Sequence, residues 1–198
     1  MKILLATHNK NKIKEIKAAL KDPEIEILSM DDFPDLPDVI EDGDTLEHNS
    51  LKKAKEIYQY SGITTLADDT GLEVEYLNGE PGVFSARWAG EDCSYEDNNR
   101  KMLRELNGVG IDKRNAVFRC VITLFGENLH KTTEGVLKGK IIEKLSGNQG
   151  FGYDPIFQPD GYDTTLAEMS LDDKNRISHR GLAVKAMAEV ICRIKKDT

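Results

Sequence analysis

The stretch Ala67-Asp68-Asp69-Thr70-Gly71-Leu72-Glu73-Val74 places two adjacent carboxylates directly after an apolar segment. Residues 63–67 lead into the two acids, and residues 72–74 resume the alternation that is typical of a strand. We expect the Thr-Gly pair to break the backbone, which would leave the acids at a strand end beside a turn. Carboxylates in such a place suit a divalent cation or a base-activated water. Taken alone, the stretch fits a solvated acidic turn better.

Length and composition favour one domain with a sizeable core, because 39% of the 198 residues are hydrophobic and 31% are charged. A net charge of -8 argues against a general nucleic-acid binder but leaves room for a local basic pocket. The cysteines, Cys93, Cys120 and Cys192, are few and far apart, so they predict neither a zinc ribbon nor a disulfide framework and fit a reducing cytosol. We find no signal sequence and no run near the roughly 18 apolar residues of a membrane span.

The N-terminal residues predict a strand, a polar turn and a helix. Residues 2–6 are apolar enough for a buried strand, and a helix should run to about Lys21. Thr7 and Asn9 are good N-cap candidates. A helix N-terminus that follows a strand is a ready anion site, and Lys12 lies one turn inside it, beside the apolar face. The turn lacks glycine, so it is not a Walker loop.

An acidic loop and a second helix follow a short strand at residues 24–28. The loop, residues 30–44, is either solvated or supplies an acid to a cation shared with the Asp-Asp pair. A helix should start at an Asp44 or Thr45 cap and end near Tyr60. Asn49 and Lys53 are four residues apart on its flank and could act together. Its predicted buried face comprises Leu51, Ala54 and Tyr58, with Ile57 at the edge.

The second half of the chain predicts a helix at 94–106, paired strands at 116–125 and 132–137, and a last helix that begins within residues 175–181. Between them, Gly147 to Pro155 is rich in glycine. Glycines around Phe151 and Tyr153 would leave these rings accessible, and Asp154 adds an acceptor, which suits a flat heterocycle. A structural glycine-rich turn explains the same residues equally well.

Several of these stretches, taken together, resemble the inosine triphosphate pyrophosphatase family. They follow one another in order over nearly the whole chain, and their joint occurrence is specific. The chain departs from the family pattern at His8, His48, Trp88 and Asn148-Gln149. The matching stretches are Ala6–Lys12, Glu41–Leu46 with Asn49 and Lys53, Ala67–Leu72, Pro81–Gly82, Ser85–Arg87, Gly150–Pro155, Lys174 and Ile177–Gly181.

The resemblance implies a magnesium-dependent enzyme that cleanses the nucleotide pool. Members of this family hydrolyse non-canonical purine nucleoside triphosphates (ITP, dITP and XTP) to the monophosphate and pyrophosphate. The implied fold is a single α/β domain over residues 1–198, with an elongated mixed β-sheet flanked by helices and a cleft between two lobes. We expect a cytoplasmic homodimer that binds a small nucleotide and makes no stable contact with nucleic acid or a membrane.

The resemblance also assigns roles. Asp69 is the expected general base on water and a ligand of Mg²⁺, with Glu41 sharing the ion and Asp68 as a further ligand or as support for Asp69. Phe151 should stack on the base, and donors from Lys174, His179 and Arg180 should meet its C6 carbonyl, so adenine would leave them unpaired. The substrate-binding residues are Thr7, His8, Asn9, Lys10, Asn11, Lys12, Lys53, Thr70, Phe151, Gly152, Tyr153, Asp154, Lys174, His179 and Arg180.

Two other interpretations stay open at this point. A sister pyrophosphatase of the Maf type would act on pyrimidine or methylated nucleotides, but it would lack the Ser178-His179-Arg180 ending. A nucleotide-sensing module without turnover is a different class, and the intact carboxylates and Lys12 argue against it.

Overall fold

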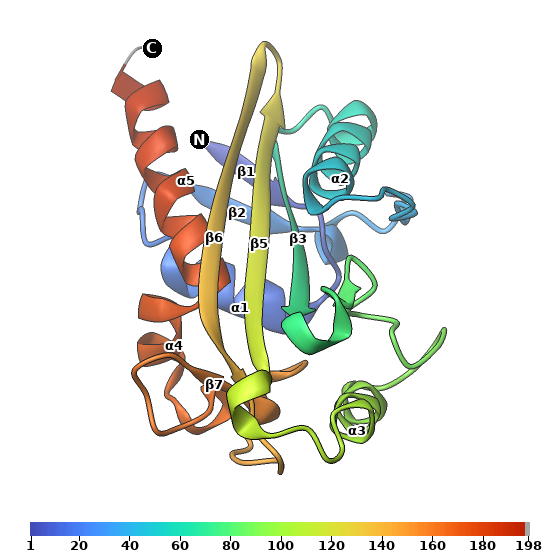
Figure 1. The fold of residues 1–198 in the computed structure, drawn as a ribbon. Helices are drawn as coiled ribbons and strands as arrows, with labels where there is room; N and C mark the ends of the chain where they lie inside the picture. Colours follow the sequence, from blue (N-terminus) through green and yellow to red (C-terminus); the bar gives the residue numbers. More distant parts are fainter. Residues whose placement is uncertain (197–198) are drawn as a thin grey trace. The chain divides into compact units, whose positions relative to one another are not determined.

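The computed structural model describes residues 1–196 and contains a mixed β-sheet with the strand order β2-β1-β3-β5-β6-β7, with β4 paired to β3 (Figure 1). β1 runs parallel to both β2 and β3, whereas the β3–β4 and β6–β7 pairs are antiparallel. The predicted mixed α/β fold is therefore confirmed. The strands are β1 (Lys2–Leu5), β2 (Glu26–Ser29), β3 (Thr65–Val74), β4 (Pro81–Gly82), β5 (Asn115–Gly126), β6 (Leu129–Ile141) and β7 (Phe157–Pro159).

The chain divides into two compact units. Unit 1 comprises residues 1–69, 120–135 and those from 179 onward, and unit 2 comprises residues 70–119 and 136–178. Strands β3, β5 and β6 contribute residues to both units, and each unit has apolar clusters of its own. The cleft that the family resemblance implies stays a prediction.

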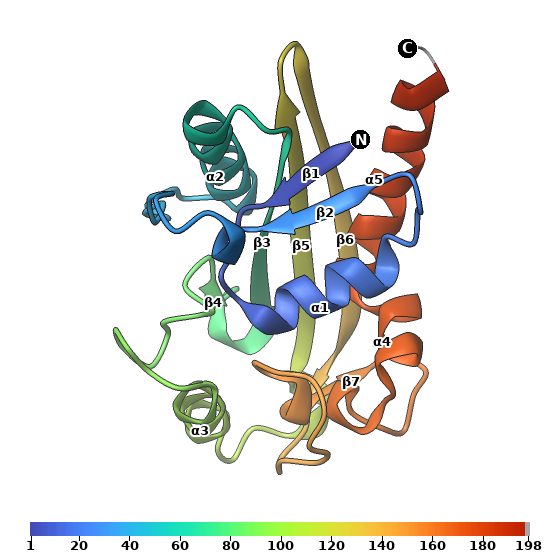
Figure 2. The ribbon, with the colours of Figure 1, turned by 180° about the vertical axis from the view of Figure 1, so that it is seen from behind.

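Unit 1 contains α1 (Lys10–Ala19), α2 (Leu46–Ser61) and α5 (His179–Lys196). Helix α1 packs against α5, and Figure 2 shows β1 and β2 side by side. Apolar spacing along α1 and α5 builds this core, as the sequence predicts. The two helices direct Ile16, Val184, Met187 and Ile191 inward. These side chains pack with Leu20, which follows α1, and with Ile3 and Leu5 of β1.

The buried face of α2 differs from the predicted one. Leu51 and Tyr58 are only partly buried, whereas Asn49 and Lys53 are buried with Ala54 and Ile57. Periodicity of apolar residues could not indicate this, because polar side chains become buried only where other polar groups bond to them. The helix therefore presents an amide and an ammonium to the interior of unit 1.

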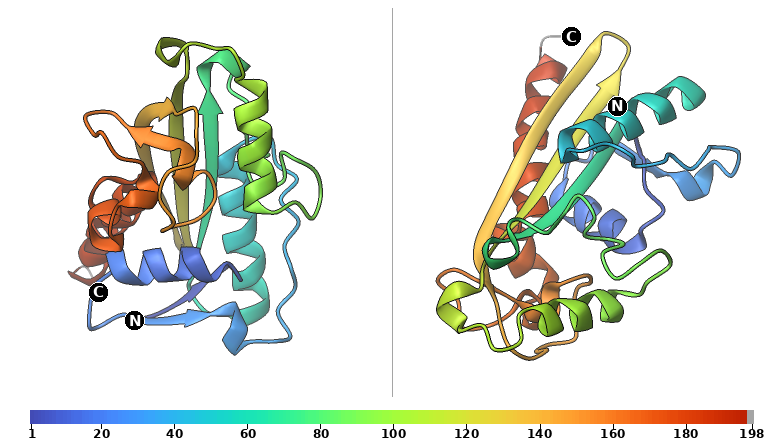
Figure 3. Two further views of the ribbon diagram at one scale, coloured as in Figure 1. Left: turned by 90° about the horizontal axis from the view of Figure 1, so that it is seen from below. Right: turned by 45° about the vertical axis from the view of Figure 1, so that its right-hand side comes forward.

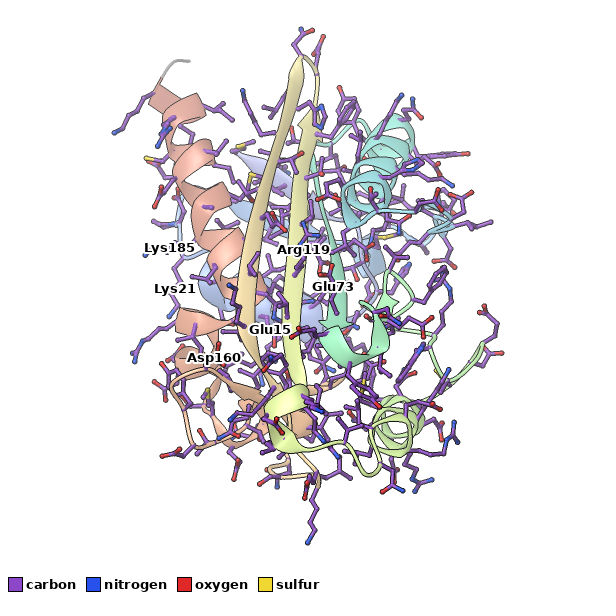
Figure 4. The ribbon with its side chains drawn as sticks, viewed as in Figure 1. Glu15, Lys21, Glu73, Arg119, Asp160 and Lys185 are labelled. Atoms are coloured by element: carbon purple, nitrogen blue, oxygen red, sulfur yellow. The ribbon has the colours of Figure 1, made fainter. Side chains whose placement is uncertain are left out.

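Unit 2 contains α3 (Tyr95–Glu105), the light-green helix in Figure 3, and α4 (Leu171–Ile177). A capping box starts α3: Ser94 Oγ accepts from Asp97 N at 3.1 Å, and the Asp97 carboxylate accepts from Ser94 N at 2.9 Å. Glu73 and Arg119 pair across neighbouring strands at 3.4 Å (Figure 4). The core of unit 2 includes Leu72, Val74, Met102, Leu106, Phe118, Ile156 and Phe157.

Three expectations about element boundaries were wrong. β3 continues through Thr70 and Gly71, so the carboxylates lie within a strand instead of at its end. β6 starts at Leu129 and runs to Ile141, well beyond the predicted 132–137. The last helix is two helices, because Ser178 has an extended backbone, with ψ 152°, between α4 and α5. Short 3₁₀ turns lie at Met30–Asp32, Glu75–Leu77, Ile111–Lys113, Asp154–Ile156 and Leu166–Glu168.

Within residues 1–196, no helix combines the length and the apolar character that a membrane crossing requires.

Candidate active site

The first turn of α1 is built as predicted, with Asn9 as its N-cap. Asn9 Oδ1 accepts from the backbone N–H groups of Asn11 at 3.0 Å and Lys12 at 3.3 Å. Thr7 Oγ1 in turn accepts from Asn9 N at 3.1 Å, which fixes the turn from β1 into the helix. The turn therefore presents the positive end of a helix dipole beside two polar side chains, which suits an anion.

Three further residues predicted to bind substrate lie around this turn. Lys10 and Asn11 are exposed in the first turn of α1. His8 is also exposed, and its Nδ1 lies 3.1 Å from Asp31 Oδ1 while its Nε2 lies 3.4 Å from Asp38 Oδ1. The ring thus connects the turn to the acidic loop. Its role in substrate binding stays a prediction, as do those of Lys10 and Asn11.

Asp68 is the anion of a buried charge network in unit 1. Its Oδ2 lies 3.2 Å from Lys12 Nζ and 3.1 Å from Arg180 Nε. Arg180 also donates to Glu15 Oε2 at 2.5 Å; Figure 4 labels Glu15 on α1. Burial alone would raise the pKa of Asp68, but the charges of Lys12, Arg180 and Lys53 outweigh it and hold that pKa well below its ordinary value. Asp68 is therefore an ionised anchor for two cations.

Asp69 lies in the opposite electrostatic environment. Lys53 Nζ donates to Glu41 Oε1 at 2.6 Å and to the Asp68 carbonyl oxygen at 2.5 Å, yet it stays 4.0 Å from Asp69 Oδ1. Burial raises the pKa of Asp69, the ammonium of Lys53 lowers it, and the negative charge of Glu41 raises it again. The pKa of Asp69 therefore lies above the ordinary value of an aspartate. The pKa of Asp68 is thus lowered and that of the adjacent Asp69 is raised. Such a difference between neighbouring carboxylates is typical of acid–base sites.

Asn49 holds Asp69 in place. Its Nδ2 donates to Asp69 Oδ2 at 3.0 Å, while its Oδ1 accepts from Gly43 N at 2.8 Å. A side chain at Gly43 would not fit, because its Cβ would lie 2.7 Å from Asn49 Oδ1. The suggestion that Asn49 and Lys53 act together is consistent with this geometry, since both approach the same carboxylate.

The carboxylates around Asp69 offer oxygen donors of the kind that a divalent cation needs. Among residues 1–196, no three His, Cys, Asp or Glu side chains converge as metal ligands. Glu41 and Asp69 both lie near Lys53 Nζ, whereas Asp68 faces Lys12 and Arg180. This arrangement fits a cation held by two carboxylates together with phosphate oxygens and water, as is usual for Mg²⁺. It does not favour Asp68 as the third ligand.

The charge balance of the buried carboxylates and cations in unit 1 also leaves room for a divalent cation. Three cationic side chains, Lys12, Lys53 and Arg180, face four carboxylates, those of Glu15, Glu41, Asp68 and Asp69. A polyphosphate entering this network would meet a site without excess positive charge. An additional cation would reduce the repulsion that a polyphosphate meets there.

Unit 2 holds a second cluster, which is suited to a flat ring. The Asp154 carboxylate accepts from Phe151 N at 2.8 Å and forms a short ion pair with Lys174 Nζ. Lys174 Nζ also lies 5.1 Å from the centroid of the Phe151 ring. Lys174 and Asp154 are buried, but Phe151 is only partly so. The cluster therefore combines an accessible aromatic ring with an oriented ammonium donor.

The structure corrects the expectation for Tyr153. This ring is buried, not accessible, and its hydroxyl donates to the Ser85 carbonyl oxygen at 2.9 Å. Burial also raises the pKa of Tyr153, so the phenol stays protonated. Tyr153 thus supports the glycine-rich segment from the core, whereas the carbonyl oxygen of Gly152 accepts from Asn99 at 2.9 Å.

Three other residues predicted to bind substrate are partly or fully buried in the structure. Thr70 is partly buried in β3, and His179 is buried at the first residue of α5. Arg180 contacts carboxylates in unit 1, and its role as a donor to the base stays a prediction. Sequence reasoning missed Glu15, although an acid three residues after Lys12, within a row of lysines, was a usable signal.

These features define a mixed α/β protein with a buried carboxylate–lysine network beside a helix N-terminus, an arrangement suited to a phosphorylated ligand. The chain belongs to the Ham1 family, whose sequence model matches residues 3–190.

Two relatives illustrate the similarity. The protein is 48% identical over 193 residues to a dITP/XTP pyrophosphatase of Caldanaerobacter subterraneus, and the match covers 96% of each chain. It is 50% identical to a dITP/XTP pyrophosphatase of Elusimicrobium minutum, with 96% of this chain and 100% of that one covered.

Solved structures agree with the fold. A HAM1 protein from Coxiella burnetii superposes with a TM-score of 0.88 at 37% identity, covering 98% of this chain and 99% of the other. The Staphylococcus aureus Ham1 protein gives a TM-score of 0.86 at 37% identity, covering 96% and 98%.

Proposed function

We propose that this protein hydrolyses non-canonical purine nucleoside triphosphates (ITP, dITP and XTP) to the nucleoside monophosphate and pyrophosphate, with Mg²⁺ as its cofactor. The observation that carries the proposal is the contrast between two adjacent buried carboxylates. Asp68 is anchored by two cations at 3.2 and 3.1 Å, whereas Asp69 is oriented by Asn49 and stays 4.0 Å from Lys53 Nζ. The names of the relatives, dITP/XTP pyrophosphatases, support this substrate class.

Asp69 acts as the general base. A carboxylate with a raised pKa accepts a proton from water more readily than an ordinary one, and such help is typically worth about 10²–10⁴ in rate. Asn49 orients it through the 3.0 Å bond to Oδ2, and Asp69 Oδ1 is the oxygen that would accept the water proton. The proton therefore moves from the attacking water to Asp69.

Lys12, Lys53 and the N-terminus of α1 bind the phosphates. Lys12 is held by Asp68 on one side and its side chain is 17% exposed, so the ammonium is both positioned and reachable. Thr7 contributes its hydroxyl at the same turn. Asp68 keeps the cations in place without competing for the water proton, because its pKa is low.

Glu41 and Asp69 would hold Mg²⁺. When bound, the ion would offset the charge of the triphosphate and lower the pKa of its bound water. Lys53 Nζ lies 2.6 Å from a Glu41 oxygen and 4.0 Å from an Asp69 oxygen, so its ammonium would supply positive charge for the phosphates beside these ligands.

Base selection rests on the cluster in unit 2. Phe151 stacks on the purine, and the ammonium of Lys174 donates to the C6 carbonyl that hypoxanthine and xanthine share. Adenine offers an amino donor at that position and would place it against the buried ammonium of Lys174, where it provides no acceptor; such a mismatch can reject an analogue by about 10⁴ or more. We infer that no residue within 1–196 offers a partner to the 2-amino group of guanine.

A substrate panel tests the proposal directly. Purified protein is incubated with ITP, dITP, XTP, GTP and ATP, and pyrophosphate release is measured with Mg²⁺ and with EDTA. Turnover of the first three, its loss in EDTA and slow turnover of GTP and ATP are expected. Equal turnover of ATP and ITP would contradict the specificity, and release of orthophosphate alone would contradict the reaction.

The proposal includes a cytoplasmic homodimer. Within residues 1–196 none of the three cysteines forms a disulfide, which fits a reducing compartment. Light scattering after gel filtration should give twice the mass of 22.2 kDa, and a monomer mass would contradict it.

A further inference from the structure

One face of α3 in unit 2 lies against the segment that carries the stacking ring. Tyr95 and Asn99 are four residues apart, so their side chains project from the same side of the helix. Tyr95 contacts the Phe151 ring, and Asn99 contacts the backbone of Gly152. Successive residues of the glycine-rich segment are thus held by successive turns of one helix.

Only one of the two polar atoms of the Asn99 side chain makes a hydrogen bond within residues 1–196. Its side chain is buried, its Nδ2 donates to the Gly152 carbonyl oxygen at 2.9 Å, and its Oδ1 is buried with no hydrogen-bond partner in the part of the chain that the structure describes. A buried carbonyl oxygen without a partner lowers stability, and an apolar side chain of similar shape would avoid that loss. The amide is therefore best explained by the bond that it makes to Gly152.

Tyr95 adds an aromatic surface next to Phe151. The two ring centroids are 5.7 Å apart with the planes tilted by 50°, within the range of favourable aromatic pairs. Lys174 Nζ approaches the same Phe151 ring. Tyr95 is 41% exposed, so a ligand that stacks on Phe151 can also contact it.

The helix itself is firmly fixed, which a platform requires. The Ser94–Asp97 capping box sets its first turn. On another face, Asn98 Oδ1 accepts from Ala89 N at 2.8 Å and Asn98 Nδ2 donates to the Ala86 carbonyl oxygen at 3.0 Å. Lys101 Nζ donates to the Trp88 carbonyl oxygen at 2.5 Å. Helix α3 is thus tied to residues 86–89 while it supports residues 151–152.

We propose that α3 determines affinity for the purine base: Asn99 is a positioning residue that holds Phe151-Gly152, and Tyr95 is a second aromatic contact for the base. This inference rests on the proposed function, because it assumes that Phe151 stacks on a purine. It predicts an effect on base binding alone, since neither residue contacts the phosphate-binding residues of the proposal.

Two ligands separate base binding from phosphate binding. Calorimetry gives Kd values for IMP, which carries the base, and for inorganic tripolyphosphate, which does not. Tyr95→Ala and Asn99→Leu should each weaken IMP binding about threefold to tenfold, the usual range for one aromatic contact, with tripolyphosphate binding unchanged. Tyr95→Phe should behave as the wild type. Tyr162→Ala is the matched control, because Tyr162 is a similarly exposed tyrosine of unit 2 at 44%.

The same measurements can overturn the inference. It fails if both variants bind IMP like the control, or if IMP and tripolyphosphate weaken together, as general damage would cause. Circular dichroism checks folding, and the exposed Tyr95 keeps the test valid if Asn99→Leu misfolds. Turnover of ITP by the wild type is measured in parallel: its absence overturns the proposed function, whereas normal turnover with unchanged variants overturns only the role of α3.

Discussion

Two glycines of the base cluster provide a matched pair of substitutions. Gly150 and Gly152 both have left-handed backbones, with φ of 71° and 64°. A Cβ at Gly152 would have no neighbour within 4 Å, whereas a Cβ at Gly150 would overlap Asp154 Oδ2. Gly152→Ala therefore incurs only the backbone strain, about 1–2 kcal/mol. Gly150→Ala must in addition displace the carboxylate that pairs with Lys174.

The magnitudes follow from this difference. Breaking a buried ion pair costs about 3–5 kcal/mol, so Gly150→Ala should lose about 4–7 kcal/mol in total. In a protein of this size 1 kcal/mol corresponds to roughly 2–4 °C in Tm. We therefore expect Tm to fall by roughly 2–8 °C for Gly152→Ala and by roughly 8 °C or more for Gly150→Ala.

Thermal unfolding by circular dichroism and calorimetry with IMP measure the two effects. Gly150→Ala should also weaken IMP binding more than about tenfold, because the ammonium of Lys174 and the backbone of Phe151 lose their common partner. Gly152→Ala should bind IMP within about threefold of the wild type. Equal melting and equal IMP affinity of the two variants would refute the reasoning about Asp154.

Other predictions concern unit 1. Lys53→Met removes a charge that lowers the pKa of Asp69, so this pKa should rise further. Because the base must be deprotonated, the acid limb of the kcat–pH profile should move to higher pH. Lys52→Met is the control, because Lys52 pairs with Asp42, and it should leave the acid limb in place. An unmoved limb in Lys53→Met would contradict this coupling. Chelation by EDTA should abolish turnover and excess Mg²⁺ should restore it with Tm unchanged, and full activity in EDTA would refute the metal requirement.

Much of the fold follows from local patterns in the sequence. Apolar runs indicate β1 and β5, the spacing of Ile16 and Leu20 indicates the buried side of α1, and Ser94 with Asp97 marks the start of α3. Each of these signals is contained within one element. The course of β3 depends on other elements, because β3 pairs with β1 before Thr70-Gly71 and with β4 after it. This pairing keeps Thr70 and Gly71 in the sheet.

The site could be predicted in its residue types more than in its pairings. Motifs indicate Asp68, Asp69, Glu41 and Lys53 as candidate site residues. The partners that distinguish the two adjacent carboxylates are far from them in the sequence. Asn49 lies 20 residues from Asp69, and Glu15 lies 165 residues from Arg180. Burial of a charged group depends on such partners, so neither the polar face of α2 nor the Glu15–Arg180 pair follows from periodicity.

The most direct test of the account compares the products of the wild type and Asp69→Asn with ITP and Mg²⁺. The wild type should release IMP and pyrophosphate in equal amounts. Asp69→Asn, which keeps the shape of the side chain, should lower kcat by at least about 10², with tripolyphosphate affinity and Tm close to those of the wild type. Formation of IDP and orthophosphate, or near-normal turnover by Asp69→Asn, would contradict the central claim that Asp69 activates water for pyrophosphate release.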